Sequence, residues 1–206
     1  MGVIQKVATF AWKGFLEQWS RDLLQDPDVV EDLPVEVVAS GWFGYPGATE
    51  AQIAQAEVRL GTVLPPSYRD FLRVSNGWRR LTPFVYRLWS TEEIEWFSVR
   101  NQDWIDAWNK YPRAVSDTDY FIYGEGQRTE RMRVEYMRTA LEISETGDSA
   151  ILLLNPQVVT GDGEWEAWFL ANWSGGAARY RSFLEMMQAQ YESFLDLREQ
   201  AAHDLP

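Results

Sequence analysis

The sequence predicts an α+β fold in which helices pack against a single, mainly antiparallel sheet. Apolar residues recur at helical spacing in the N-terminal third of the chain and again over 180–202. Between 120 and 170, short apolar runs are separated by turns too short for the crossover that parallel strands need. The chain has 206 residues, 46% of them apolar, so we expect one domain over 1–206 whose core needs no disulfide or structural metal.

The N-terminal segment predicts one amphipathic helix over residues 9–25, with Thr9 as its cap. Residues 26–36 follow with five acidic residues and no Lys or Arg, and they include Pro27 and Pro34. Because proline interrupts helix interiors, we interpret 26–36 as an acidic loop or linker. The segment is either a solvated linker or a contact surface for a basic partner.

Two further helices are predicted from local signals. Thr49 and Gln52 have the spacing of a capping box, and Gly61 supplies the left-handed residue that commonly ends a helix. The pair 65–66 is Pro-Pro, which starts a second helix because the first amide of a helix needs no partner. Asn-Gly at 76–77 ends that helix.

The middle of the chain changes from helix to strand. Residues 84–89 alternate between apolar and polar types, which predicts a strand. Ser90 and Glu93 form a second capping-box pattern, which predicts a short helix through Phe97. Apolar residues over 104–108 predict one more helical piece.

The remaining segments predict strands and one closing helix. Glycine and aspartate at 147–148 and 161–163 mark two hairpin turns. Apolar residues at helical spacing over 180–202 predict a long helix that packs on the sheet. The predicted strands are 120–123, 132–136, 140–144, 151–154 and 164–170.

The residue types exclude several classes of enzyme. The chain has no cysteine, so it can form no thiolate nucleophile, cysteine-ligated zinc, iron–sulfur cluster or redox dithiol. Its one histidine, His203, lies three residues from the end, where a frayed terminus cannot hold a catalytic triad. Asp117 and Asp119 have the spacing that begins a calcium loop, but the later ligands are missing. We therefore expect no metal, no cofactor and no enzymatic activity.

Paired carboxylates are the remaining catalytic possibility. Glu164 and Glu166 lie two apart on a predicted strand, so their side chains share one face, as in a glycosidase pair. The alternative is a solvated strand face opposite a buried one. We favour the solvated face, because no neighbouring residue in the sequence would separate the two pKa values as acid–base catalysis requires.

The charge indicates the kind of partner. With 31 acidic against 19 basic residues the formal net charge is −12, which disfavours nonspecific binding of DNA or RNA and favours a basic protein partner. Solubility alone also accounts for such a charge. The N-terminus lacks the pattern of a signal peptide, and no apolar stretch reaches the roughly 18 residues of a membrane span. We expect a cytoplasmic protein that binds no membrane.

Aromatic residues add candidate contacts. The chain has 11 tryptophans, and those at helical spacing, such as Trp12, Trp19 and Trp108, are expected in the core. Trp42 and Tyr45 lie in a glycine-rich loop before a helix. Each either closes an edge of the core or is displayed to a partner, and the sequence leaves both open.

Residues 47–78 contain a dense series of short motifs. They are, in order, Gly47-Ala48-Thr49, Ile53 with Ala56-Glu57, Leu60-Gly61, Leu64-Pro65, Ser67-Tyr68-Arg69 with Phe71-Leu72, and Ser75-Asn76-Gly77. This series resembles the signature of the SUKH superfamily, also called the Smi/Knr family. Later runs over 141–154, 163–168 and 180–183 resemble the strands and closing helix of that family, so the resemblance covers about residues 40–190.

The resemblance implies an α+β fold and a binding function. Bacterial members are mostly immunity proteins, which bind and neutralise a secreted or contact-delivered toxin, often one that acts on nucleic acid; fungal members act in cell-wall signalling. It therefore implies a cognate protein toxin as partner. A regulatory or scaffold module and, more remotely, a carboxylate enzyme remain alternatives, and a monomer is favoured slightly over an oligomer.

Partner choice is expected in the parts that depart from the family core, the N-terminal helix at about 9–25 and an insertion at about 100–133. The acidic and aromatic residues offered as partner contacts are Trp42, Tyr45, Asp117, Asp119, Glu125, Glu164 and Glu166.

Overall fold

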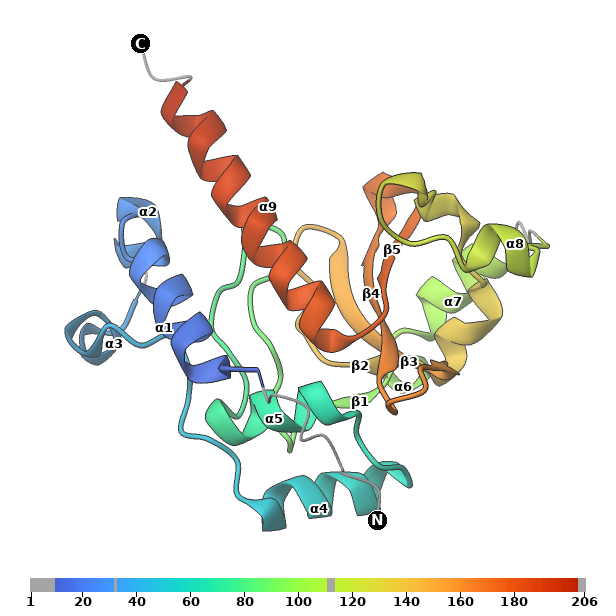
Figure 1. The fold of residues 1–206 in the computed structure, drawn as a ribbon, viewed down its shortest axis with the longest axis horizontal. Helices are drawn as coiled ribbons and strands as arrows, with labels where there is room; N and C mark the ends of the chain where they lie inside the picture. The colour runs from blue at the N-terminus through green and yellow to red at the C-terminus, as the bar shows by residue number, and fades with distance from the viewer. Residues whose placement is uncertain (1–9, 32, 111–113, 204–206) are drawn as a thin grey trace, which may run out of the picture. The chain divides into compact units, whose positions relative to one another are not determined.

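The structure, a computed structural model, describes residues 10–31, 33–110 and 114–203 (Figure 1). Contacts divide the chain into two compact units, Met1–Gly44 and Tyr45–Pro206. Helices surround a five-stranded antiparallel sheet, which confirms the predicted α+β class. The expectation of a single domain over 1–206 stays a prediction.

In the first unit, helix α1 spans Trp12–Leu23 and buries its apolar stripe, including Trp12 and Trp19. The predicted helix over 9–25 is thus confirmed with shorter ends, and the proposed cap Thr9 lies outside the described residues. The Ser20 hydroxyl donates to the Leu16 carbonyl and accepts from the Phe43 amide at 3.2 Å. This bond joins the end of the unit to α1.

The prediction of a loop at 26–36 is wrong, because two short helices, α2 (Pro27–Glu31) and α3 (Val35–Ser40), occupy most of it. The two prolines of the segment are compatible with these short helices. Pro27 is the first residue of α2 and Pro34 is the N-cap of α3, and at both positions the missing amide costs no helical hydrogen bond. Val29 and Val37 are buried, so packing adds to the stability of these acidic turns.

The second unit begins with the two helices that local signals predicted. Helix α4 (Glu50–Leu60) has both hydrogen bonds of the Thr49–Gln52 capping box, and Gly61 ends it with a φ of +68°. Helix α5 spans Pro66–Val74 and starts at the proline pair. Both predictions are confirmed.

The segment between α5 and the sheet is less regular than predicted. Residues 84–89 form isolated bridges, such as Leu88 with Ser144, in place of a strand. Ser90 and Glu93 do bond to each other, but they close a turn that leads into strand β1 (Glu95–Trp96), followed by helix α6 (Phe97–Arg100). The predicted helix through Phe97 is therefore wrong at its start, because β1 pairs with β2 (Leu141–Glu142) and draws the chain into the sheet.

The sheet has the order β1-β2-β3-β4-β5 with antiparallel neighbours throughout. Strands β3 (Ala150–Val159) and β4 (Trp165–Ala171) form its centre and match the predicted hairpin. Strand β5 (Gly176–Tyr180) was not predicted, because its Gly-Ala-Ala start has low β-propensity. The short 3₁₀ turn η4 (Asn172–Ser174) joins β4 to β5.

Two predicted strands, 120–123 and 132–136, are wrong. Helix α7 (Gln102–Asn109), which was predicted, is followed by a helix α8 (Asp117–Tyr120) that was not. Three 3₁₀ helices come next, and their bounds are η1 Gly124–Gly126, η2 Thr129–Arg131 and η3 Val134–Thr139. Tyr120 and Tyr123, whose pattern suggested a strand, instead bond to the side chain of Glu166 on β4.

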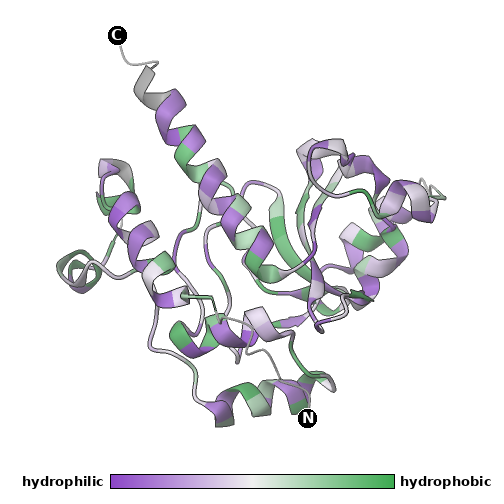
Figure 2. Ribbon diagram, in the orientation of Figure 1, coloured by the Kyte–Doolittle hydropathy of each residue, from purple (hydrophilic) through white to green (hydrophobic). Residues whose placement is uncertain are grey.

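The core of the second unit lies on both faces of the sheet. Figure 1 shows α5 and α9 (Phe183–His203) on one side of it and α7 and α8 on the other. Figure 2 shows hydrophobic residues concentrated along the strands, whereas α9 alternates hydrophobic and hydrophilic residues. On the α7 side, Phe97, Ile105 and Met137 pack with Trp168 and other side chains of β3 and β4 in one cluster.

Candidate functional site

Three of the predicted contact residues gather on α8 and the loop after it. Residues 114–127 contain three acidic residues and no Lys or Arg. Two apolar side chains of the same segment are exposed, Phe121 at 47% and Ile122 at 40%. We call the exposed set the α8 surface; its members are Asp117, Asp119, Phe121, Ile122 and Glu125.

The acidic residues of the α8 surface are only partly neutralised. Ser116 caps α8 by accepting from the Asp119 amide at 3.2 Å, and Arg133 forms an ion pair with Asp117. Within the parts of the chain that the structure describes, no basic group lies within 4.0 Å of the carboxylate of Asp119 or Glu125. The surface therefore combines uncompensated negative charge with exposed apolar area.

Glu166 lies beneath this surface and is 1% exposed. Its Oε2 accepts hydrogen bonds from the Tyr120 hydroxyl at 2.6 Å and the Trp168 indole at 2.7 Å. Oε2 also accepts from the Asn155 amide at 2.9 Å, and Oε1 accepts from the Tyr123 hydroxyl at 2.8 Å. The expectation that Glu166 is a solvated contact residue is therefore wrong, because β4 is covered on both faces and donors satisfy the carboxylate.

Arg179 on β5 completes this buried cluster. Its Nη1 lies 3.7 Å from Glu166 Oε1, and its guanidinium lies 4.3 Å from the centre of the Tyr120 ring. The guanidinium also donates to the carbonyl of Tyr120, and the Gln127 side chain bonds both the amide and the carbonyl of Arg179. The Glu166 network, as we call it, thus holds the backbone of the α8 surface onto β4 and β5.

Burial and the nearby Glu166 carboxylate raise the pKa values of both Tyr120 and Tyr123 far above that of free tyrosine. Both hydroxyls therefore stay protonated and remain donors to Glu166 over the whole range of physiological pH. The network does not loosen by titration of its tyrosines.

Glu164 has a different structural partner. It is 9% exposed, and its carboxylate accepts from the Ser67 amide and the Ser67 hydroxyl, each at 2.7 Å. A carboxylate at this position caps the N-terminus of α5 and complements the helix dipole. Burial raises the pKa of Glu164 despite these bonds. The prediction of a solvated Glu164 is wrong for the same reason as for Glu166.

The two remaining predicted residues lie elsewhere. Tyr45 is half-buried, its amide donates to the Ser75 hydroxyl just after α5, and the Arg79 guanidinium lies 4.1 Å above its ring. Figure 1 shows α5 and α8 well apart, so Tyr45 is not part of the α8 surface. Trp42 is half-buried and belongs to the first unit.

Sequence reasoning missed Phe121, Ile122 and Arg179. The two apolar residues were assigned to a strand, which hid their exposure. A usable signal was present, because Ser116 and Asp119 have the Ser-x-x-Asp spacing of a helix start. Arg179 gave no signal, since a single arginine in a short strand is ordinarily a surface residue.

Across the described ranges, no three or more His, Cys, Asp or Glu side chains gather as a metal site would require. No helix in those ranges is both long and apolar enough to span a bilayer.

Comparison with known proteins gives one family. The sequence model described as SMI1 / KNR4 family (SUKH-1) matches residues 47–195, which include α4, α5, the whole sheet and the α8 surface. No curated protein matches the chain.

Proposed function

We propose, from the premise that this chain belongs to the SMI1 / KNR4 family (SUKH-1), that it is an immunity protein. It binds a cognate protein toxin in the cytoplasm and neutralises it by contact, without catalysis. The single observation that carries the proposal is the α8 surface, where unpaired carboxylates adjoin exposed Phe121 and Ile122.

The charge of this surface suits a toxin that acts on nucleic acid. Such a toxin needs a positive surface to attract phosphates, and the same surface attracts an acidic inhibitor. Negative charge on the inhibitor accelerates the encounter, and apolar side chains buried in the complex slow dissociation. The α8 surface supplies both kinds of group within residues 117–125.

The Glu166 network supports the proposal energetically. Ordering a loop when a partner binds costs free energy, so a surface that is already ordered binds more tightly. The segment of the α8 surface is bonded to β4 through Glu166 and to β5 through Arg179. It is therefore expected to keep one conformation before and after binding.

A growth-rescue experiment tests the proposal. The product of the adjacent gene is expressed alone and together with the chain, and surviving cells are counted. The variant Asp119→Lys with Glu125→Lys reverses the charge of the α8 surface. Its matched control, Glu192→Lys with Asp196→Lys, makes the same charge change at exposed positions of α9.

We expect the wild type and the α9 control to restore growth and the α8 variant to fail. Two results would contradict the proposal: a neighbour that is harmless in the absence of the chain, or one that kills whether or not the chain is present. The first result would favour the regulatory or scaffold function, and a pull-down from cell extract would then identify its partner. Equal protection by all three proteins would support immunity and exclude the α8 surface as the contact.

A further inference from the structure

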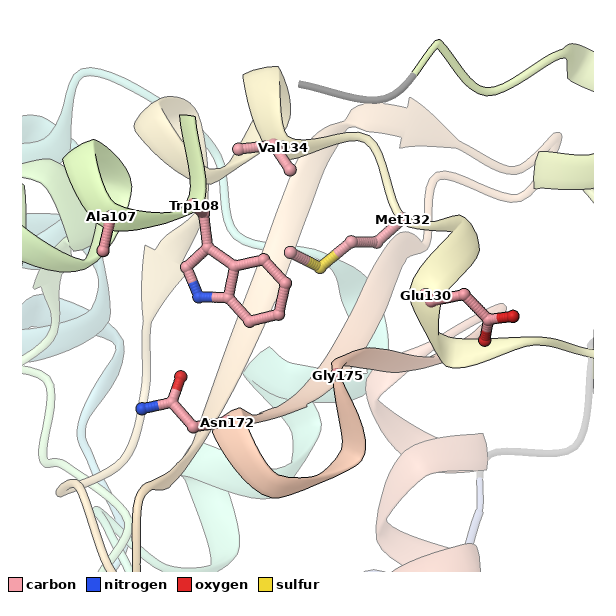
Figure 3. A pocket seen from close by; sticks show the side chains of 7 residues that line it. All are labelled: Ala107, Trp108, Glu130, Met132, Val134, Asn172 and Gly175. Carbon is pink, nitrogen blue, oxygen red and sulfur yellow. The ribbon is translucent and has the colours of Figure 1, made fainter. Parts of the chain in front are cut away.

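A hollow of about 300 Å³ lies between α7, η2 and the turn from β4 to β5 (Figure 3). Its volume is at the lower end of the range for small-ligand sites, so it fits one small ring system or one large side chain. We call it the Trp108 pocket. The lining residues that matter below are Ala107, Trp108, Glu130, Met132, Val134 and Asn172.

The walls of the pocket are fixed before anything binds. Trp108 and Val134 pack against the core cluster that contains Met132. The Thr129 hydroxyl donates to the Ser174 carbonyl at 2.9 Å, which ties η2 to the turn at η4. Because its walls are already ordered, this apolar hollow can bind a ligand without the free-energy cost of ordering the site.

One edge of the pocket is polar. Figure 3 shows the indole nitrogen of Trp108 and the side-chain amide of Asn172 on the same side of the hollow. Among the residues that the structure describes, neither group has a hydrogen-bond partner. Glu130 lies at the rim, but its carboxylate points away from the hollow and forms an ion pair with Arg128.

These features define the chemistry of an occupant. The Trp108 ring and the Met132 thioether favour an aromatic ring. The indole N–H of Trp108 can donate to a hydroxyl of the occupant, and that hydroxyl can donate to the side-chain carbonyl oxygen of Asn172. The net charge of −12 disfavours an anionic occupant.

We propose that the Trp108 pocket receives one tyrosine side chain from the basic partner protein. A tyrosine fills the apolar volume with its ring and satisfies both polar groups with its hydroxyl. Charge complementarity places that tyrosine on a basic surface. This inference rests on the proposed function, because it assumes that the partner is a protein.

The test uses the full chain and needs no partner. The indole N–H signal of Trp108 is assigned among the 11 tryptophans with the variant Trp108→Phe, and followed by NMR. N-acetyl-tyrosinamide should shift this signal saturably, with a Kd on the order of 1 mM. N-acetyl-phenylalaninamide should bind at least about fivefold more weakly, because it lacks the hydroxyl that makes both hydrogen bonds. N-acetyl-leucinamide should leave the signal unchanged.

Three variants test whether the ligand binds in the Trp108 pocket. Ala107→Leu fills the pocket from an exposed position of α7 and should abolish the shift, whereas Ala54→Leu, at an exposed position of α4, should keep it. Asn172→Ala leaves the pocket open and removes one of the two hydrogen bonds to the hydroxyl, so it should weaken the preference for tyrosinamide over phenylalaninamide. Retained binding by a folded Ala107→Leu protein would overturn the inference.

Other outcomes are equally informative. No shift with N-acetyl-tyrosinamide, or an equal shift with N-acetyl-leucinamide, would also overturn it. Tighter binding of adenosine would assign the pocket to a free nucleoside and show the tyrosine assignment to be wrong. Because the titration contains only this chain, its failure beside a successful growth rescue would refute the pocket and leave the immunity proposal intact.

Discussion

At the scale of single residues, burial changes the role of a carboxylate completely. Glu164 and Glu166 are two positions apart, and both were expected on a solvated face. Glu164 caps α5 through Ser67, and Glu166 accepts four hydrogen bonds in the Glu166 network. Each acts within the protein, so neither is available as a direct contact to a partner.

Glu166→Ala should lower the free energy of unfolding by about 3–5 kcal/mol. The change leaves the buried Arg179 guanidinium without its counter-charge and removes the acceptor of Tyr120 and Trp168. Urea unfolding followed by circular dichroism measures the loss. Glu125→Ala, at an exposed site, should change stability by no more than about 0.5 kcal/mol. If Glu166→Ala lowers the free energy of unfolding no more than Glu125→Ala does, the Glu166 network does not stabilise the fold.

Glu142 should make stability depend on pH. Burial raises its pKa even though Arg100, Trp89 and Asn101 bond the carboxylate. The folded protein then holds this proton more tightly than the unfolded chain does, so the contribution of Glu142 to stability falls as pH rises through the raised pKa.

The variant Glu142→Gln removes this titration. Its stability relative to wild type should therefore increase between about pH 4 and pH 8, as the wild-type carboxylate ionises. Urea unfolding of both proteins across this range measures the difference. A difference that stays constant, or that falls with rising pH, would mean that the pKa of Glu142 is not raised.

At the scale of helices and turns, local capping stabilises the start of α4. Thr49→Ala should destabilise the protein by about 1 kcal/mol, because the Gln52 amide loses its side-chain acceptor. Thr62→Ala, just beyond the end of α4, removes a hydroxyl with no capping bond and serves as control. Equal unfolding midpoints for the two variants would show that the capping box does not stabilise α4.

Close backbone packing decides where η2 lies. A Cβ added at Gly176 on β5 would lie 2.1 Å from the carbonyl oxygen of Thr129, so Gly176→Ala should cost about 1–3 kcal/mol. At Gly161 an added Cβ would meet no atom within 4 Å, so Gly161→Ala should leave stability unchanged or slightly higher. Thermal unfolding of both variants tests this contact, and a tolerated Gly176→Ala would place η2 farther from β5.

At the scale of the whole molecule, charge should govern how fast the partner is found. Association with a toxin identified by growth rescue should slow at least about tenfold between low and high salt, because screening shortens the reach of the −12 charge. The α8 charge-reversal variant should lose more of this salt dependence than the α9 control. Stopped-flow association rates measure it, and rates that are independent of salt would exclude electrostatic steering.

Expectations from the sequence were most accurate where structure depends on neighbours in the chain. The capping box at Thr49, the proline start of α5 and the glycine end of α4 were confirmed, because each involves groups within a few residues. Residues 120–136 failed because their aromatic side chains matched a strand pattern. Their conformation is set instead by contacts with β4 and β5.

By itself, the sequence determined the α+β class, the main helices, the central hairpin and the family signature. Only the tertiary structure decided that Glu164 and Glu166 are buried, that β5 closes the sheet and that α7, η2 and η4 enclose the Trp108 pocket. The reason is the separation of the groups involved. Ser67 and Glu164 bond across 97 positions and Tyr120 and Glu166 across 46, and no local pattern records such pairs.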